Sequence, residues 1–209
     1  TTANDNTAVG YFALSSNTTG SQNTGFGRGV MATNTTGSGN TAVGNRAFEN
    51  NTTGSENTAV GANALDANTT GQRNTAVGYN SGSAITTGNY NAAFGSNFSL
   101  GRTTTGSYNA AFGDGALAHN TTANFNVAMG QAALHANTTG ASNTGLGYYA
   151  LGSNTTASDN TAVGKQALYA NTTGANNTGI GVGALTANTT GAGNTAIGRN
   201  SFSANTTGS

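Results

Sequence analysis

The sequence lacks cysteine, proline and tryptophan, and only 6% of its 209 residues are charged, against about 25% in ordinary soluble proteins. The absence of cysteine excludes a disulfide framework and thiolate chemistry. Six basic and six acidic residues cancel, so no net charge attracts nucleic acid or an anionic membrane surface. No apolar run approaches the roughly 18 residues that a membrane-spanning helix requires. We therefore expect no nucleic-acid partner and no membrane insertion for this segment.

The dominant feature of the sequence is a seventeen-residue repeat. An Asn opens each of twelve units, at residues 6, 23, 40, 57, 74, 91, 109, 126, 143, 160, 177 and 194. Every step is seventeen residues except the step of eighteen between Asn91 and Asn109, where one extra residue enters near Phe98. Residues 1–209 therefore read as a single repeat array. Because both ends interrupt the pattern, we expect the array to be a segment of a longer fibre.

The unit Asn57–Arg73 defines positions 1 to 17 of the repeat. Position 1 is always Asn, position 3 is always Ala or Gly, position 4 is always a larger apolar residue and position 5 is always Gly. Positions 8 and 9 are mostly a small and then a large apolar residue, and Asn-Thr-Thr usually fills positions 12 to 14. If the units stack, the residues at each position form a ladder along the stack. Representative residues of these ladders are Asn6 and Asn57 (position 1), Val60 (position 4), Gly61 (position 5), Leu65 (position 9) and Asn68 (position 12).

This pattern predicts an all-β fold. Fixed Gly residues and repeated Thr-Thr pairs oppose helix, and no apolar stripe of helical period survives. Short extended pieces between glycines are typical of strands and turns. We expect a parallel β-solenoid, or β-roll, of about twelve seventeen-residue coils, in which Gly61 and its equivalents supply a corner with positive φ or a close backbone approach.

Pairs of adjacent apolar residues suggest that one chain cannot bury all of its own apolar side chains. Successive residues of a strand face opposite sides, so Ala59 and Val60 would line two faces, and Ala64 and Leu65 would do the same. A single thin coil encloses only one core, so it can bury only one of these two faces. We therefore expect a homo-oligomer, and a trimer in particular.

The units Asn6-Thr7-Ala8-Val9-Gly10, Asn57-Thr58-Ala59-Val60-Gly61 and Asn194-Thr195-Ala196-Ile197-Gly198 resemble the head repeats of YadA-like trimeric autotransporter adhesins. The full unit is also similar to repeats of phage tail-fibre-like proteins. The resemblance implies a parallel β-roll of three chains and brings no catalytic residue with it. We also expect no cofactor. The adhesin repeat is usually shorter, so its handedness is not carried over.

The Asn-Thr-Thr triplets have two interpretations. They match the N-glycosylation acceptor pattern, but sugars could not occupy every coil of a stack spaced about 4.8 Å apart. We favour a ladder of Asn amides that hydrogen-bond along the axis. The Thr rows also suggest ice binding, although only one Thr of each pair can face outward, and we favour their role as strand formers.

Other polar residues predict no site. The acidic residues are scattered over different positions, unlike those of calcium-binding solenoids, so we expect no metal. His119 and His135 fall on adjacent coils, and we interpret both as solvated surface residues without a catalytic partner.

One region departs from the consensus in several places at once. Between residues 79 and 130, Ile85 and Thr103 replace the Asn of position 12. Position 17 becomes Tyr90, Tyr108 and Phe125 on three successive coils. These rings could form a contact platform for a sugar or a partner protein. Alternatively, they pack between chains, around the extra residue.

The sequence therefore predicts a non-enzymatic structural shaft of an extracellular, cell-surface or virion fibre that serves surface attachment. It would belong to a phage tail fibre or a trimeric adhesin, and a host-surface glycan or receptor is the expected external partner. An ice-binding solenoid and a repetitive surface-layer or matrix protein are the alternatives.

Overall fold

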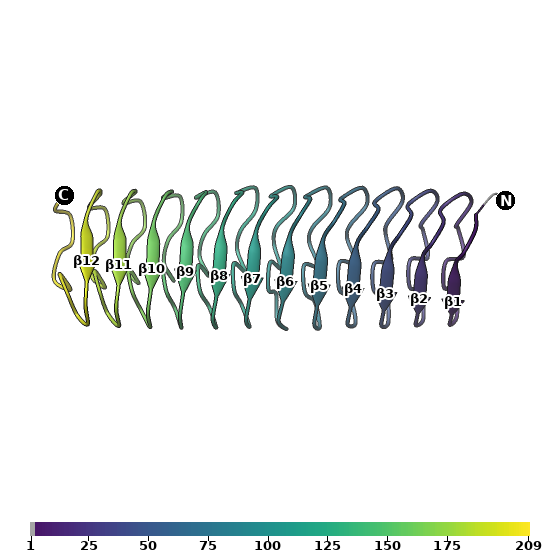
Figure 1. Cartoon of the computed structure of the whole chain (residues 1–209), viewed down its shortest axis with the longest axis horizontal. Coiled ribbons are helices and arrows are strands. Elements are labelled where there is room, and N and C mark those ends of the chain that lie inside the picture. The colour runs from purple at the N-terminus through teal and green to yellow at the C-terminus, as the bar shows by residue number, and fades with distance from the viewer. Residues whose placement is uncertain (1–2) are drawn as a thin grey trace.

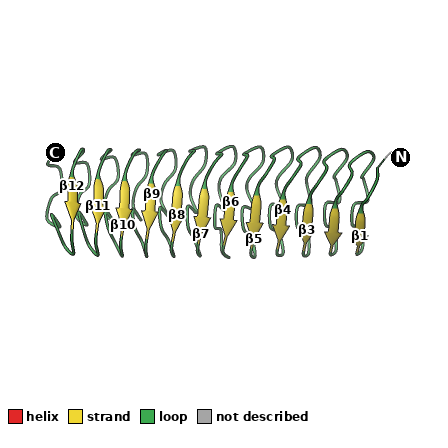
Figure 2. Ribbon diagram, in the orientation of Figure 1, coloured by secondary structure: helices red, strands yellow, loops and turns green. Residues whose placement is uncertain are grey.

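Each repeat unit forms one coil, and the coils stack into a straight rod (Figure 1). The computed structural model describes residues 3–209. Every coil contributes one three-residue strand, and the remainder is loop and turn (Figure 2). The strands are β1 (Thr7–Val9), β2 (Thr24–Phe26), β3 (Thr41–Val43), β4 (Thr58–Val60), β5 (Thr75–Val77), β6 (Ala92–Phe94), β7 (Ala110–Phe112), β8 (Val127–Met129), β9 (Thr144–Leu146), β10 (Thr161–Val163), β11 (Thr178–Ile180) and β12 (Thr195–Ile197). The predicted parallel β-solenoid is confirmed.

The twelve strands form one parallel sheet in chain order, β1 to β12. Equivalent positions pair directly, so Thr58, Ala59 and Val60 lie opposite Thr75, Ala76 and Val77. Hydrogen bonds between coils continue beyond the strands. Leu65 N–H donates to the Ser81 carbonyl at 3.0 Å, and Thr69 N–H donates to the Thr86 carbonyl at 2.9 Å. Each coil is therefore joined to the next around most of its circumference.

The invariant Gly of position 5 has both of the predicted properties. Gly61 has φ +133, and a Cβ atom placed there would lie 2.4 Å from the Gly78 carbonyl oxygen of the next coil. Only glycine adopts such a backbone conformation readily, and only glycine leaves room for the neighbouring backbone. This residue sets the spacing of the corner that follows each strand.

One prediction about the apolar pairs is wrong. Positions 8 and 9 do not face opposite sides, because Ala64 and Leu65 are both fully buried inside the same chain. Leu65 has φ +51, and Asn63 at position 7 has φ +55. These two left-handed residues interrupt the extended backbone, so the alternation of a strand does not apply. Position 9 therefore supplies the large side chain of the core.

The strand itself follows the predicted alternation. Ala59 at position 3 is fully buried, whereas 36% of Val60 at position 4 is exposed. The core of the rod thus consists of Asn at positions 1 and 12 together with the apolar residues of positions 3, 8 and 9. Only position 4 presents a regular apolar row that its own chain leaves uncovered.

The irregular fifth coil repacks its core with a different residue. Gly82 stands where other coils have a large apolar side chain at position 9. A Cβ atom on Gly82 would lie 3.2 Å from Cδ1 of Ile85 and 3.0 Å from Cδ2 of Leu65. Ile85, at position 12, is fully buried. The two substitutions therefore compensate each other, since Ile85 fills space that the missing side chain would otherwise occupy.

The eighteen-residue step leaves the sheet undisturbed. The extra residue lies in the corner that holds Asn97 and Phe98, which have φ values of +47 and +70. Strands β6 and β7 still pair in the common register. The coil thus absorbs an additional residue after its strand, at a corner that does not contribute to the core.

Candidate functional site

The longest candidate interaction surface is the row of position-4 side chains, which we call the apolar stripe. It runs along the outer face of the sheet. Its members are Val9, Phe26, Val43, Val60, Val77, Phe94, Phe112, Met129, Leu146, Val163, Ile180 and Ile197. None of them is buried, and Phe94 and Phe112 stack with ring centroids 4.9 Å apart. A continuous apolar row of this length is a feature that soluble monomers usually avoid.

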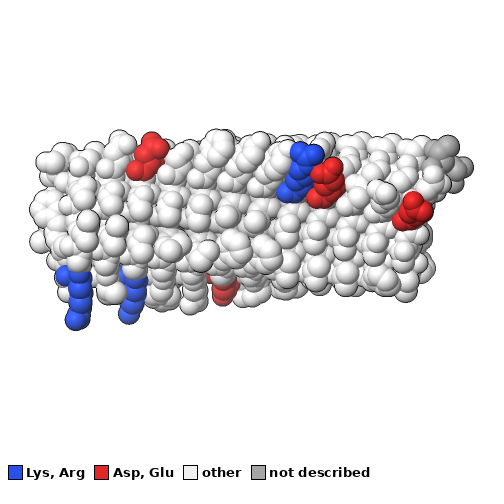
Figure 3. All heavy atoms as spheres, in the orientation of Figure 1, with Lys and Arg blue, Asp and Glu red and all other residues white. Residues whose placement is uncertain are grey.

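Charged side chains form no regular row on the rod comparable to the apolar stripe. Few charged side chains are visible on the face drawn in Figure 3, where one basic and one acidic side chain lie side by side and the others stand apart. The part of the chain that the structure describes contains two ion pairs, Arg46–Glu49 and Arg73–Glu56. The rod therefore offers hydrophobic and hydrogen-bonding contacts rather than a charged patch.

The structure brings Tyr90, Tyr108 and Phe125 together in one row. Tyr90 and Tyr108 stack with centroids 4.9 Å apart and planes 6° apart, and Tyr108 and Phe125 follow at 5.2 Å and 14°. The Arg73 guanidinium covers the other side of Tyr90, 5.3 Å from the ring centroid. It also donates to the Tyr90 hydroxyl and pairs with Glu56, which lowers the pKa of the Glu56 carboxyl.

This geometry limits what the three rings can bind. Sugars stack on the faces of aromatic rings, but here the faces are turned toward one another and toward Arg73. Only the outer face of Phe125 is free, because the next residue in that row is Ser142. The rings lie at a different corner from the extra residue near Phe98, so the row is not a repacking around the insertion. They are 42% to 58% exposed in the single chain, and their packing between chains stays a prediction.

The Asn residues form two ladders inside the rod. Asn57 Nδ2 donates to the Gly71 carbonyl at position 15 of the same unit, at 2.9 Å, and its Oδ1 accepts the Asn74 N–H of the next coil at 2.8 Å. At position 12, Asn51 Nδ2 donates to Asn34 Oδ1 at 2.7 Å. This second ladder is interrupted beside Ile85, and the amide of Asn68 has no hydrogen-bond partner. The position-12 amides of the inner coils, from Asn34 to Asn188, are fully buried, so a glycosyltransferase could not reach them in the folded coil.

The two Thr residues of each triplet have different environments. Thr52 at position 13 is half-buried, and its hydroxyl donates to the Thr69 carbonyl of the next coil at 2.9 Å. Thr53 at position 14 is exposed. Position 14 is Thr in all twelve units, and none of these second hydroxyls forms a hydrogen bond within the chain between residues 3 and 209. Each pair thus contributes one outward hydroxyl, in a row along the rod.

His119 and His135 lie in contact, with ring centroids 4.7 Å apart. Both are half-buried rather than fully solvated, beside a hollow of about 160 Å³ that Phe98 and Arg102 also line. Burial lowers the pKa of His119, and the neighbouring charges of His135 and Arg102 lower it further. The folded chain therefore favours the neutral form of this imidazole.

We predict that His119 makes the rod less stable in mild acid. A histidine whose pKa is lower in the folded state binds its proton preferentially in the unfolded state, so stability is lost as the pH falls below about 6.5 toward the lowered pKa. The melting temperature should fall between about pH 7.5 and pH 5, and His119→Gln should reduce that fall. An equal fall in the wild type and in His119→Gln would contradict this expectation.

Among residues 3–209, no group of three or more His, Cys, Asp or Glu side chains is placed to hold a metal ion. In the same residues, no helix is long and apolar enough to cross a membrane.

Comparison with known proteins gave no relatives: no family model, curated protein or solved structure matches this chain.

Proposed function

We propose that this chain is a non-enzymatic structural shaft that associates with copies of itself into a fibre for surface attachment, outside the cell or on a virion. The apolar stripe is the observation that carries this proposal. It runs the length of the rod on the outer face of a regular sheet. The best complement to a periodic surface of this kind is another surface with the same period. A second copy of the chain supplies such a surface.

The geometry of the coil supports a role as a spacer. Strands lie across the rod at about 4.8 Å intervals, so the twelve strands extend it by roughly 55 Å. Hydrogen bonds join neighbouring coils on several sides. Such a rod holds whatever it carries at a fixed distance. We propose three copies, with the stripes turned toward a common axis, in a phage tail fibre or a trimeric adhesin.

The proposal predicts a trimer in solution, with a mass of 3 × 20.4 kDa, or about 61 kDa. Charges on the stripe should prevent association, because a trimer would bury them without partners. The double substitution Val43→Lys and Val77→Glu should shift the mass toward that of the monomer. Light scattering coupled to size-exclusion chromatography measures this shift.

A matched control places the same charges away from the stripe. Asn45 and Tyr79 belong to the same two coils and are exposed at position 6. Asn45→Lys with Tyr79→Glu should leave the trimer intact. A wild-type chain that stays at 20.4 kDa with full β-structure by circular dichroism would overturn the proposal.

Ice binding is a second candidate, favoured by the outward row of position-14 hydroxyls. These hydroxyls have no partner within the described chain and repeat at about 4.8 Å, the spacing of the strands. A row of this kind could order water. Thermal hysteresis in the wild type that disappears when Thr53 and Thr70 are replaced with Lys would favour this function over the shaft.

A further inference from the structure

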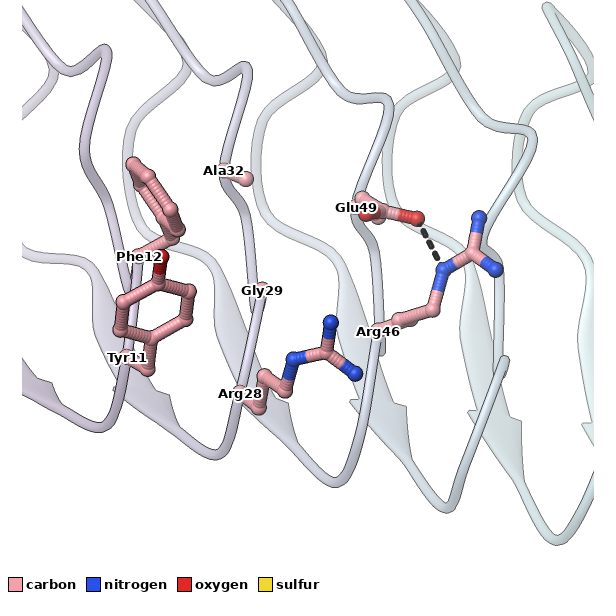
Figure 4. A pocket seen from close by; sticks show the side chains of 7 residues that line it. All are labelled: Tyr11, Phe12, Arg28, Gly29, Ala32, Arg46 and Glu49. Carbon is pink, nitrogen blue, oxygen red and sulfur yellow. Dashed lines mark hydrogen bonds and ion pairs between the residues drawn. The ribbon is translucent and has the colours of Figure 1, made fainter.

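A hollow of about 430 Å³ interrupts the outer surface of the first three coils. Figure 4 shows it between an aromatic wall on one coil and a charged wall two coils away. Its lining residues are Tyr11, Phe12, Arg28, Gly29, Ala32, Arg46 and Glu49.

The hollow exists because the middle coil has small residues where its neighbours have large ones. Position 7 is Phe12 in the first coil, Gly29 in the second and Arg46 in the third. Ala32 provides a second small residue on the floor. Coils repeat at about 4.8 Å, so the two walls stand roughly 10 Å apart. That distance accommodates one six-membered ring.

The aromatic wall offers an open ring face. Tyr11 and Phe12 pack edge to face, with centroids 4.3 Å apart and an interplanar angle of 76°. They are 67% and 58% exposed, and no further aromatic ring stacks on them among residues 3–209. Unlike the row at Tyr90, this pair therefore leaves a ring surface free for the C–H groups of a sugar ring.

Among the charged groups that line the hollow, one cationic side chain, Arg28, has no ion-pair partner within residues 3–209. Arg46 Nε pairs with Glu49 Oε2 at 2.5 Å, so these two charges neutralise each other. Arg28 forms no ion pair within the part of the chain that is described, and its guanidinium points across the hollow toward the coil of Arg46 (Figure 4). Glu49 Oε1 lies 3.4 Å from the place of a Cβ atom on Gly29, so this oxygen faces the floor and is free to accept a hydrogen bond.

We propose that this hollow binds a carboxylated pyranose, that is, an acidic sugar residue of a glycan. The apolar face of the ring would lie on Tyr11 and Phe12, and its carboxylate would pair with Arg28 in a bidentate fork. A ring hydroxyl would donate to Glu49 Oε1. An inorganic anion would leave the aromatic wall unused, and a neutral sugar would leave Arg28 unpaired. The site lies within one chain, so it does not depend on the proposed oligomer.

Calorimetric titration of the purified chain with methyl glucuronide tests the site. A ligand of this size should bind with a Kd on the order of 1 mM. Methyl glucoside, which lacks the carboxylate, should bind at least about ten times more weakly. Acetate and inorganic phosphate, which lack the ring, should also bind more weakly than the glucuronide.

Two variants separate the site from the fold. Gly29→Asn should fill the hollow and abolish binding without unfolding, because Asn63, Asn80 and Asn200 occupy position 7 elsewhere with φ of 53° to 55°. Gly115→Asn makes the same change at position 7 of another coil and should leave binding intact. Arg28→Gln should weaken binding at least about tenfold, whereas Arg199→Gln, also at position 6, should not.

Three results would overturn the proposal. They are no measurable heat with methyl glucuronide, equal affinity for acetate or phosphate, and unchanged binding by a folded Gly29→Asn variant. The first result would mean that no such sugar binds, and the second would indicate a simple anion site. None of the three would affect the mass measurement that tests the fibre, so the two proposals can fail separately.

Discussion

Gly61→Ala should open the coils on both sides of the substitution, with a loss of about 3 kcal/mol or more in local stability. Two effects add together. At φ +133 an alanine is strained, and its Cβ would lie 2.4 Å from the Gly78 carbonyl oxygen. That oxygen belongs to backbone, and Gly78 N–H donates to the Val60 carbonyl at 2.8 Å. The next coil therefore cannot move away without breaking its own hydrogen bonds.

Gly39→Ala is the matched control. Gly39 also has positive φ, +69, but the nearest atom to its added Cβ is 3.8 Å away. Gln22 and Glu56 occupy the same position with φ of 59° and 60°. This variant should lose only about 1 kcal/mol.

Hydrogen exchange is the appropriate measurement for both variants, because repeat arrays open locally and a single unfolding transition does not describe them. In Gly61→Ala, amide protection should fall in the coils of β4 and β5 first. Equal protection in the two variants would contradict the steric explanation.

Asn57→Leu should lower the stability of the rod by about 2–6 kcal/mol, although leucine is more hydrophobic than asparagine and similar in size. Asn57 satisfies the Gly71 carbonyl of the same unit and the Asn74 N–H of the next coil. Its replacement leaves both groups buried without a partner, at about 1–3 kcal/mol each. Chemical denaturation combined with hydrogen exchange at Asn74 measures the loss.

Asn63→Ala is a control for the loss of an amide at the surface. Asn63 Nδ2 donates to Asn80 Oδ1 at 3.1 Å, but both residues are half-exposed, so water replaces the lost bond. Ala132 occupies the same position with a similar φ of 55°. A cost for Asn63→Ala as large as that for Asn57→Leu would show that burial of the ladder is not the cause.

The period of the sequence was sufficient to predict the solenoid, the role of Gly61 and the alternation of Ala59 and Val60. It was not sufficient for positions 8 and 9. Asn and Gly at positions 7 and 17 hint at left-handed backbone, but Leu65 gives no such signal, because leucine rarely adopts positive φ. Here the Leu65 N–H donates to the Ser81 carbonyl of the next coil, and the Leu65 carbonyl accepts the Asn68 N–H, so these two bonds hold it in that conformation.

The surface sites were harder to predict, because they depend on residues from successive coils. Tyr90, Tyr108 and Phe125 could be placed in one row from their spacing alone. Which ring faces remain free could not be read from spacing, since it depends on side-chain rotation and on Arg73. The hollow at Gly29 was missed altogether. Its signal was a glycine between Phe12 and Arg46 at the same position of three coils, which becomes visible only when the units are aligned as ladders.

The direction of the hydrogen bonds between coils has a mechanical consequence. They run along the rod, whereas the covalent chain runs mostly around it. Tension on the rod is therefore carried by the noncovalent bonds in series, and the rod should yield by peeling one coil at a time. Each coil of seventeen residues would release roughly 55–60 Å of extended chain in place of about 4.8 Å of rod. A shaft built in this way holds its length under small loads and lengthens about twelvefold under large ones, so it could absorb a sudden pull without breaking a covalent bond.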